Sequence, residues 1–253
     1  MNIFLLFFLL AFISSCATVP YTNRKAFIML TPYEETYLGE QAFIEVKNNS
    51  KLSNNYLEND LIKKVGEKIA LAANKPDYKW EFILIDDTGT INAFCLPGGK
   101  VAFYSGILPL CKDENGIAVV MGHEIAHALA RHGAERISQG ELVKLAGRLL
   151  AAATSDSSQQ KQDLLLTAYG LTTTLGVMLP FSRKQEYEAD YIGLILMAKA
   201  GYDPNTAVEF WTRMYELSKN KTIPEFLSTH PSDKNRIKEI KNKIPEAMKY
   251  YKK

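Results

Sequence analysis

The spacing of hydrophobic and polar residues predicts a mostly helical chain with one small sheet. Two stretches, 78–87 and 92–106, are rich in aromatic and β-branched residues, and Pro97-Gly98-Gly99 supplies a turn inside the second. They are typical of two or three strands that include a hairpin. The expected fold class is therefore α+β. Apolar residues recur at helical spacing in segments 33–47, 57–73, 114–137, 141–153, 184–200, 204–219 and 234–250.

Two segments in the middle of the chain depart from this pattern. Residues 154–163 are polar and predict a loop. Residues 164–181 are largely apolar, but their glycines, three consecutive threonines and modest length do not suit a membrane span. This second segment predicts either a buried helix beside the functional site or an exposed helix near a lipid surface.

The N-terminus has the composition of an export signal. Its apolar run, Ile3–Ile13, is shorter than the roughly 20 residues of a spanning helix, and no Lys or Arg precedes it. Ile13-Ser14-Ser15-Cys16 resembles a bacterial lipobox, in which the cysteine becomes the lipidated first residue. We expect a lipoprotein signal peptide at 1–15 and a lipidated tether at 16–30; the alternative is a simple secretory signal. Because Ala17 is not the aspartate that retains lipoproteins at the inner membrane, we expect an outer-membrane lipoprotein facing the periplasm of a diderm bacterium.

Charge and cysteine content narrow the class of partner. The 253 residues carry a formal net charge of +2 without a basic stripe interleaved with aromatics, which argues against binding of nucleic acid. Residues 231–253 hold eight Lys/Arg and three Asp/Glu. This is either the solvated face of a terminal helix or an approach to anionic lipid headgroups. An oxidising compartment would permit a disulfide between Cys95 and Cys111, but the sequence does not show whether the two residues are close enough to form one.

The segment from Val119 to Arg136 contains three of the four histidines in the chain. On a helix, His123 and His127 lie one turn apart on one face, so both imidazoles can reach the same ion. Glu124 is rotated by about 100° round the helix, where it can contact a water on that ion without being a ligand. These are the requirements of a zinc hydrolase. His132 is off this face, and we expect it to support the ligands from behind or to lie on the surface.

A catalytic zinc usually has three protein ligands and one open position. Glu186 and Asp190 are spaced by four on a later helical segment, so one carboxylate could bind the metal while the other accepts the free N–H of a ligand histidine. Taken alone, these acids are more simply the charged face of a solvated helix. His230 precedes Pro231, which favours an extended turn, and a lone histidine there is usually a surface residue.

The motifs together resemble a known family. GHEIAHALARH, SRKQEYEAD and THPSDKNRI, with NAFCLPGGKVAFYSGIL before them, are similar to the zinc metallopeptidase family of Oma-type, HtpX-type and Ste-type proteases, the gluzincins. The strongest likeness is to the periplasmic lipoprotein members BepA and LoiP. The resemblance implies a zincin-like metallopeptidase domain over 31–253, with HExxH on a long helix. The tetratricopeptide repeats of BepA have no counterpart in this sequence, so we expect a single domain without them.

The resemblance also implies roles for the site residues. It implies one Zn²⁺ per chain, with Glu124 as the general base and Asp190 as the residue that orients a ligand histidine; Glu188 is expected to be structural. His230 can fill the open metal position as a reversible plug, or it can stabilise the oxyanion of the tetrahedral intermediate. Arg236 is expected to anchor the His230 segment by ion pairing. The implied zinc ligands are His123, His127 and Glu186.

For function, the resemblance implies a metalloendopeptidase that degrades misfolded or stalled envelope proteins in periplasmic quality control. The implied substrate-binding edge strand is Asn92-Ala93-Phe94, although this segment could be an ordinary hairpin that covers the core. The expected partners are unfolded envelope polypeptides, the membrane through lipid on Cys16, and outer-membrane assembly machinery. A rival interpretation is a chaperone-like assembly factor that binds clients with little proteolysis. A hydrolase of non-peptide substrates would need a closed pocket instead of a strand template.

Overall fold

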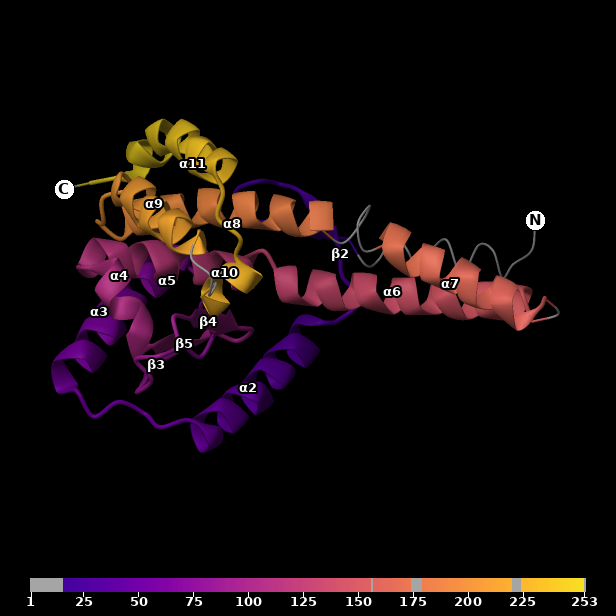
Figure 1. Ribbon diagram of the computed structural model, residues 1–253. Helices are drawn as coiled ribbons and strands as arrows, with labels where there is room; N and C mark the ends of the chain where they lie inside the picture. Colours follow the sequence, from indigo (N-terminus) through magenta and orange to yellow (C-terminus); the bar gives the residue numbers. More distant parts are fainter. Residues whose placement is uncertain (1–15, 156, 174–178, 220–223, 253) are drawn as a thin grey trace. The chain divides into compact units, whose positions relative to one another are not determined.

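Figure 1 shows a computed structural model of the chain, which describes residues 16–155, 157–173, 179–219 and 224–252. Most of these residues are helical, so the expected class, α+β with a small sheet, is confirmed. The longer helices are α2 (Pro32–Asn49), α3 (Tyr56–Ala73), α5 (Glu114–Leu129), α6 (His132–Ala153), α7 (Gln159–Thr173), α8 (Leu179–Lys199), α9 (Thr206–Ser218) and α11 (Lys234–Ala247). The short helices are η1 (Ser105–Ile107), α4 (Leu108–Cys111), α10 (Glu225–Thr229) and η3 (Met248–Tyr250). The strands are β1 (Cys16–Thr18), β2 (Lys25–Phe27), β3 (Glu81–Ile85), β4 (Ala93–Leu96) and β5 (Lys100–Tyr104).

The chain forms two compact units. One combines the chain up to Thr31 with Arg131–Glu186, and the other combines Pro32–Ala130 with the chain from Tyr187 onward. The last boundary falls inside α8, which therefore contributes residues to both units.

In the first unit, a hairpin of short strands packs against α6. β1 and β2 pair antiparallel, so the segment expected to be a tether, 16–30, contains regular structure. The Arg24 guanidinium donates two hydrogen bonds to the Glu135 carboxylate, at 2.7 and 2.9 Å. The Met29 backbone N–H donates to Ser138 Oγ at 2.8 Å. These contacts fix both ends of β2 on the helix.

The single long helix expected over 114–137 is wrong, because it is two helices. α5 ends at Leu129, and Arg131 has a φ of +58°, in the left-handed region where a helix cannot continue. α6 begins at His132 and runs on through 141–153, which was expected to be a separate helix. Hydrophobic spacing could not find the break, since Ala130 and Arg131 are both good helix formers.

α6 and α7 form a helical hairpin (Figure 1), and Tyr169 Oη donates a hydrogen bond to the Val143 carbonyl at 3.0 Å. The loop expected at 154–163 is too long, because α7 begins at Gln159. None of the side chains described between 159 and 170 is buried, so the expectation of a buried helix does not hold for this part of the apolar segment. Within the described ranges, no helix has the length and apolar character needed to span a membrane.

The second unit is built on a three-stranded sheet with strand order β3-β5-β4. β3 runs parallel to β5, and β4 pairs antiparallel with it through the expected turn, where Gly98 and Gly99 have φ values of +86° and +83°. Phe43 of α2 packs on one face of the sheet, and α3 and α5 lie on the other (Figure 1). The order leaves β4 as an edge strand, and the predicted hairpin is confirmed.

α5 and α8 approach each other closely through two glycines. A Cβ on Gly193 would lie 2.9 Å from the His123 backbone nitrogen, and a Cβ on Gly122 would lie 2.9 Å from the Gly193 carbonyl oxygen. Any side chain at either position would push the helices apart. The contact brings Asp190, one turn before Gly193, up to His123.

Cys95 and Cys111 do not form a disulfide in the structure. Cys95 on β4 is half-buried, Cys111 at the end of α4 is buried, and both are free thiols. Burial raises the pKa of the Cys95 thiol, and the negative charge of Glu124 raises it further. Burial also raises the pKa of the Cys111 thiol, so neither group is a ready thiolate.

Candidate metal centre

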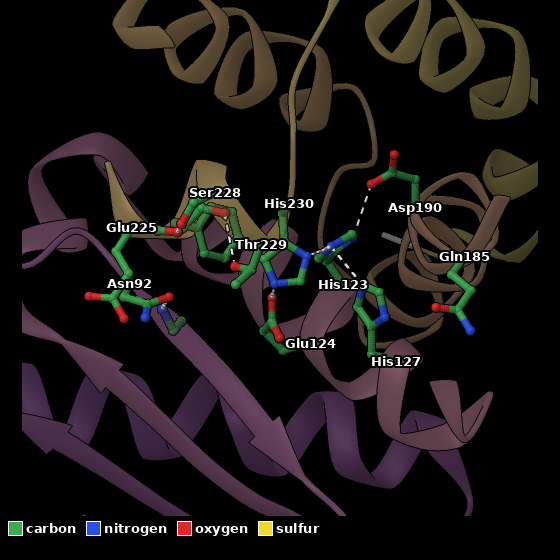
Figure 2. A network of polar contacts seen from close by, with 12 residues as sticks. Asn92, His123, Glu124, His127, Gln185, Asp190, Glu225, Ser228, Thr229 and His230 are labelled. Atoms are coloured by element: carbon green, nitrogen blue, oxygen red, sulfur yellow. Dashed lines mark hydrogen bonds and ion pairs between the residues drawn. The ribbon is translucent and has the colours of Figure 1, made fainter. Parts of the chain in front are cut away.

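Three histidine side chains from two distant parts of the sequence meet at one point. His123 and His127 project from the same face of α5, as their spacing predicts, and His230 follows α10. Figure 2 shows the His230 ring lying against both. The His123 Nε2 atom is 3.1 Å from His127 Nε2 and 3.1 Å from His230 Nδ1. All three residues are buried, at 1%, 6% and 7% exposure.

The donor set fits a zinc ion. A tetrahedral site with Zn–N bonds of about 2.0–2.1 Å has ligand nitrogens about 3.3 Å apart, close to the spacing found here. The His123 Nε2 atom faces two further ring nitrogens, and when these three nitrogens carry no proton their lone pairs can converge on one cation. Glu186 on α8 is buried and offers a carboxylate oxygen to the same group, whose four ligand atoms lie within 4.8 Å of one another.

Asp190 sets the tautomer of His123. Its Oδ1 lies 3.0 Å from His123 Nδ1, so the proton of the ring is held on that side and Nε2 keeps its lone pair. Burial alone would raise the pKa of the Asp190 carboxyl, but the guanidinium of Arg236 holds that pKa below its usual range. Asp190 is therefore an anion, and the structure places it where the sequence expected an orienting carboxylate.

Glu124 lies beside the histidines rather than among them. It is 3% exposed, and its Oε1 is 3.4 Å from Nε2 of His230 (Figure 2). This is the position expected of a carboxylate that handles protons next to a metal. Two further residues singled out in the sequence, His132 and Glu188, are buried too. For His132 the surface alternative is therefore wrong.

Aromatic side chains hold His230 in place. Its ring lies 4.7 Å from the ring of Phe226, measured between centroids, and Phe226 stacks on Trp211 at 5.9 Å. Trp211 in turn meets His123 edge to face at 5.4 Å. His230 is therefore buried within the site in this structure and is not a surface residue. Sequence reasoning missed Trp211 and Phe226, and their signal was only an apolar position on a short or amphipathic helix.

The structure places Asn92 just before edge strand β4 and Ala93 and Phe94 within it. The Asn92 side-chain oxygen accepts from the Ala93 N–H at 2.9 Å. The Ile91 carbonyl accepts from the Phe226 N–H at 3.1 Å, so α10 covers the start of this edge. The predicted strand is thus at an edge, beside the segment that carries His230.

The comparisons with known proteins agree with this geometry. The model of Peptidase family M48 matches residues 56–244. The mitochondrial metalloendopeptidase OMA1 of Schizosaccharomyces pombe is 42% identical over 91% of this chain and 67% of its own length. Human metalloendopeptidase OMA1 is 30% identical over 96% of this chain and 49% of its own. The β-barrel assembly-enhancing protease of Escherichia coli is 28% identical over 92% of this chain and 48% of its own.

These matches identify the enzyme family and the metal that the family uses. The chain spans about half the length of the human and Escherichia coli relatives. The family uses zinc, and the buried group of three histidines and a glutamate is a donor set of the kind that zinc takes. Because the family model covers most of the chain and the fission-yeast relative is similar over nearly all of it, the chain belongs to peptidase family M48, a family of zinc metallopeptidases.

Proposed function

We propose that this protein is a zinc-dependent endopeptidase that cleaves misfolded or stalled polypeptides of the bacterial envelope, and that His230 holds it latent. One observation carries the proposal: three buried imidazole nitrogens meet with the Glu124 carboxylate beside them. The relatives support it by name, since two are metalloendopeptidases and one is a protease that enhances β-barrel assembly. That last name also favours outer-membrane assembly machinery as a partner.

The residues then divide the chemistry among them. His123, His127 and Glu186 would hold the zinc ion. Zinc bound there supplies a Lewis acid for the scissile carbonyl and makes water more acidic. Glu124 accepts the proton of the attacking water and returns it to the leaving amine. Asp190 keeps the proton of His123 on Nδ1, so that its Nε2 faces the metal.

His230 is proposed to block the reaction in the resting protein. Its Nδ1 faces the nitrogen of a zinc ligand, and its Nε2 faces the carboxylate that must handle the proton. One ring thus occupies the position that water and the substrate carbonyl need. Moving it away would open the fourth metal position and free Glu124 together. A role in stabilising the oxyanion is the opposite case, because there the loss of His230 lowers the rate.

Substrate is proposed to bind as an added strand on β4. The Tyr104 N–H donates to the Asn92 carbonyl at 3.0 Å, so by alternation Phe94 also faces β5 while the backbone groups of Ala93 and Cys95 point outward. An extended polypeptide can pair with those groups without regard to its side chains, which suits unfolded clients. Two peptides can be compared, one N-methylated at the odd positions and the other at the even positions. Only the peptide whose methyl groups replace the N–H groups facing β4 should lose cleavage. Equal loss in both peptides would contradict strand pairing.

The proposed organisation follows the sequence motifs. Residues 1–15 form the lipoprotein signal peptide, 16–30 a lipidated segment that includes the β1–β2 hairpin, and 31–253 the peptidase, anchored through Cys16 to the periplasmic face of the outer membrane. The residues before Cys16 lie outside those that the structure describes. The support is therefore the apolar run followed by the lipobox, together with the assembly-related name of the Escherichia coli relative.

The test compares cleavage of an unfolded protein by the zinc-loaded parent, Glu124→Gln and His230→Ala. We expect a slow parent, a faster His230→Ala variant, and a loss of about 10²–10⁴-fold in Glu124→Gln, since the amide cannot take a proton. Zinc content is measured for each protein. If all three bind zinc and none cleaves, the protease proposal fails and a client-binding assembly factor takes its place. If His230→Ala is slower than the parent, the plug is wrong.

A further inference from the structure

Arg236 is the most deeply buried charged side chain beside the site, at 2% exposure. It lies in the first turn of α11, where its backbone N–H donates to the helix-capping carboxylate of Asp233 at 2.8 Å. A guanidinium cannot lose its proton in a protein, so its charge must be met in place. The groups that contact this guanidinium therefore indicate the role of Arg236 in the site.

One side of the guanidinium holds Asp190. Nε and Nη2 of Arg236 donate to the two carboxylate oxygens at 2.7 and 2.8 Å, a bidentate pair. The same carboxylate holds His123 Nδ1. Through Asp190, Arg236 thus fixes the orientation of one proposed zinc ligand.

The other side holds the backbone around His230. Nη1 of Arg236 donates to the carbonyl of His230 at 3.2 Å and to the carbonyl of Pro231 at 3.0 Å. The Cζ atom of Arg236 lies 3.5 Å from the ring centre of Trp211, so the guanidinium also packs on an aromatic ring. The charge of Asp190 is already balanced by the bidentate pair. The two hydrogen bonds to the carbonyls of His230 and Pro231 are therefore a second, separate role of the Arg236 side chain.

We propose that Arg236 is a positioning residue that locks His230 onto the metal centre through the backbone carbonyls of His230 and Pro231, while it holds the ligand His123 through Asp190. The inference rests on the proposed function, because it assigns the group that keeps His230 in the blocking position. Opening the site then means moving α11 with its guanidinium, not only turning one histidine ring.

The test is Arg236→Lys, which keeps the positive charge beside Asp190 but has its donors on one nitrogen, so it lacks the planar fork that reaches the carboxylate on one side and the two carbonyls on the other. The Co²⁺-loaded protein is used, because its visible spectrum reports whether His230 is a ligand. We expect the spectrum of Arg236→Lys to match that of His230→Ala and to differ from that of the parent. Cleavage by Arg236→Lys should rise as in His230→Ala, with no further rise in the double variant.

A matched control is Arg213→Lys. Arg213 also donates to a backbone carbonyl, that of Leu110 at 2.9 Å, and also lies over an aromatic ring, that of Phe210. It makes the same kinds of contact without touching His230, so its cobalt spectrum should equal that of the parent. If Arg236→Lys also gives the parent spectrum, the proposed lock is overturned.

A second variant keeps the test open if the lysine protein fails to fold, as circular dichroism would reveal. Arg236→Ala leaves a space of guanidinium shape, and guanidinium added below denaturing concentrations should restore the parent spectrum; no restoration counts against the lock. The spectrum also separates this inference from the proposed function. If no protein cleaves but Arg236→Lys and His230→Ala share a spectrum, the lock stands and the protease proposal falls.

Discussion

At the scale of single residues, the site depends on a carboxylate that is kept charged while buried. Asp190 is 6% exposed, and an unpaired anion there would be costly. Arg236 supplies the opposite charge and His123 supplies a proton donor, so the anion is satisfied on both sides. The tautomer of His123 is thus decided by a residue that is not itself a ligand.

This arrangement predicts the effect of Asp190→Asn on metal binding. The amide keeps the size of the side chain but loses the charge that accepts the His123 proton and offsets Arg236. We expect zinc affinity to fall about 10–100-fold, measured by competition with a chelator. Asp86→Asn, which removes an acid paired with Lys51 far from the histidines in sequence, should bind zinc as the parent does. An unchanged affinity in Asp190→Asn would show that Asp190 does not orient the ligand.

At the scale of elements, the sequence predicted most helices and the hairpin because each has a periodic apolar face. It also predicted that the two α5 histidines share one face, because a helix fixes residues four apart, whereas the separate roles of Glu186 and Asp190 were implied only by the family resemblance. Three features had no such signal: the break at Arg131, the short helix α10, and the close contact of Gly122 with Gly193. Each depends on tertiary contacts, which override local propensity.

The joint between α8 and α11 gives a prediction at this scale. Tyr191 Oη donates to the Glu246 carboxylate at 2.5 Å, and Lys243 lies over the Tyr191 ring. Burial, with the Glu246 charge added to it, raises the pKa of Tyr191 to about 12. Tyr191→Phe should lower the free energy of unfolding by about 1 kcal/mol at neutral pH, because it removes one hydrogen bond whose strength is reduced by partial exposure to solvent.

The raised pKa fixes how this difference depends on pH. The tyrosine contributes fully below the pKa of about 10 in the unfolded chain, where it is neutral in both states. Above that pH the unfolded state ionises first, so the contribution falls and is lost as the pH passes about 12. Urea unfolding of parent and variant should therefore differ at pH 8 and converge at high pH. A difference that is constant over this range would contradict the assigned pKa.

At the scale of the whole molecule, the family resemblance reaches across both compact units, since the fission-yeast relative matches 91% of the chain. The catalytic motifs do not determine the cellular location of a protein of this family. Relatives with the same chemistry are named as mitochondrial in yeast and human, and as assembly-enhancing in Escherichia coli. Location has to come from the N-terminal sequence, where the resemblance of residues 13–16 to a lipobox is the informative feature.

The lipobox predicts that Cys16 carries the lipid anchor. Cys16→Ser removes the thiol that would be acylated, so labelling of the protein with radioactive palmitate in growing cells should be lost completely. Cys95→Ser makes the same atomic change at a free thiol and should leave the label in place. Ala17→Asp keeps the anchor but adds the retention signal, and it should move the labelled protein from the outer to the inner membrane on a density gradient. If Cys16→Ser is labelled like the parent, the anchor lies elsewhere; if no protein is labelled, the segment is a simple secretory signal.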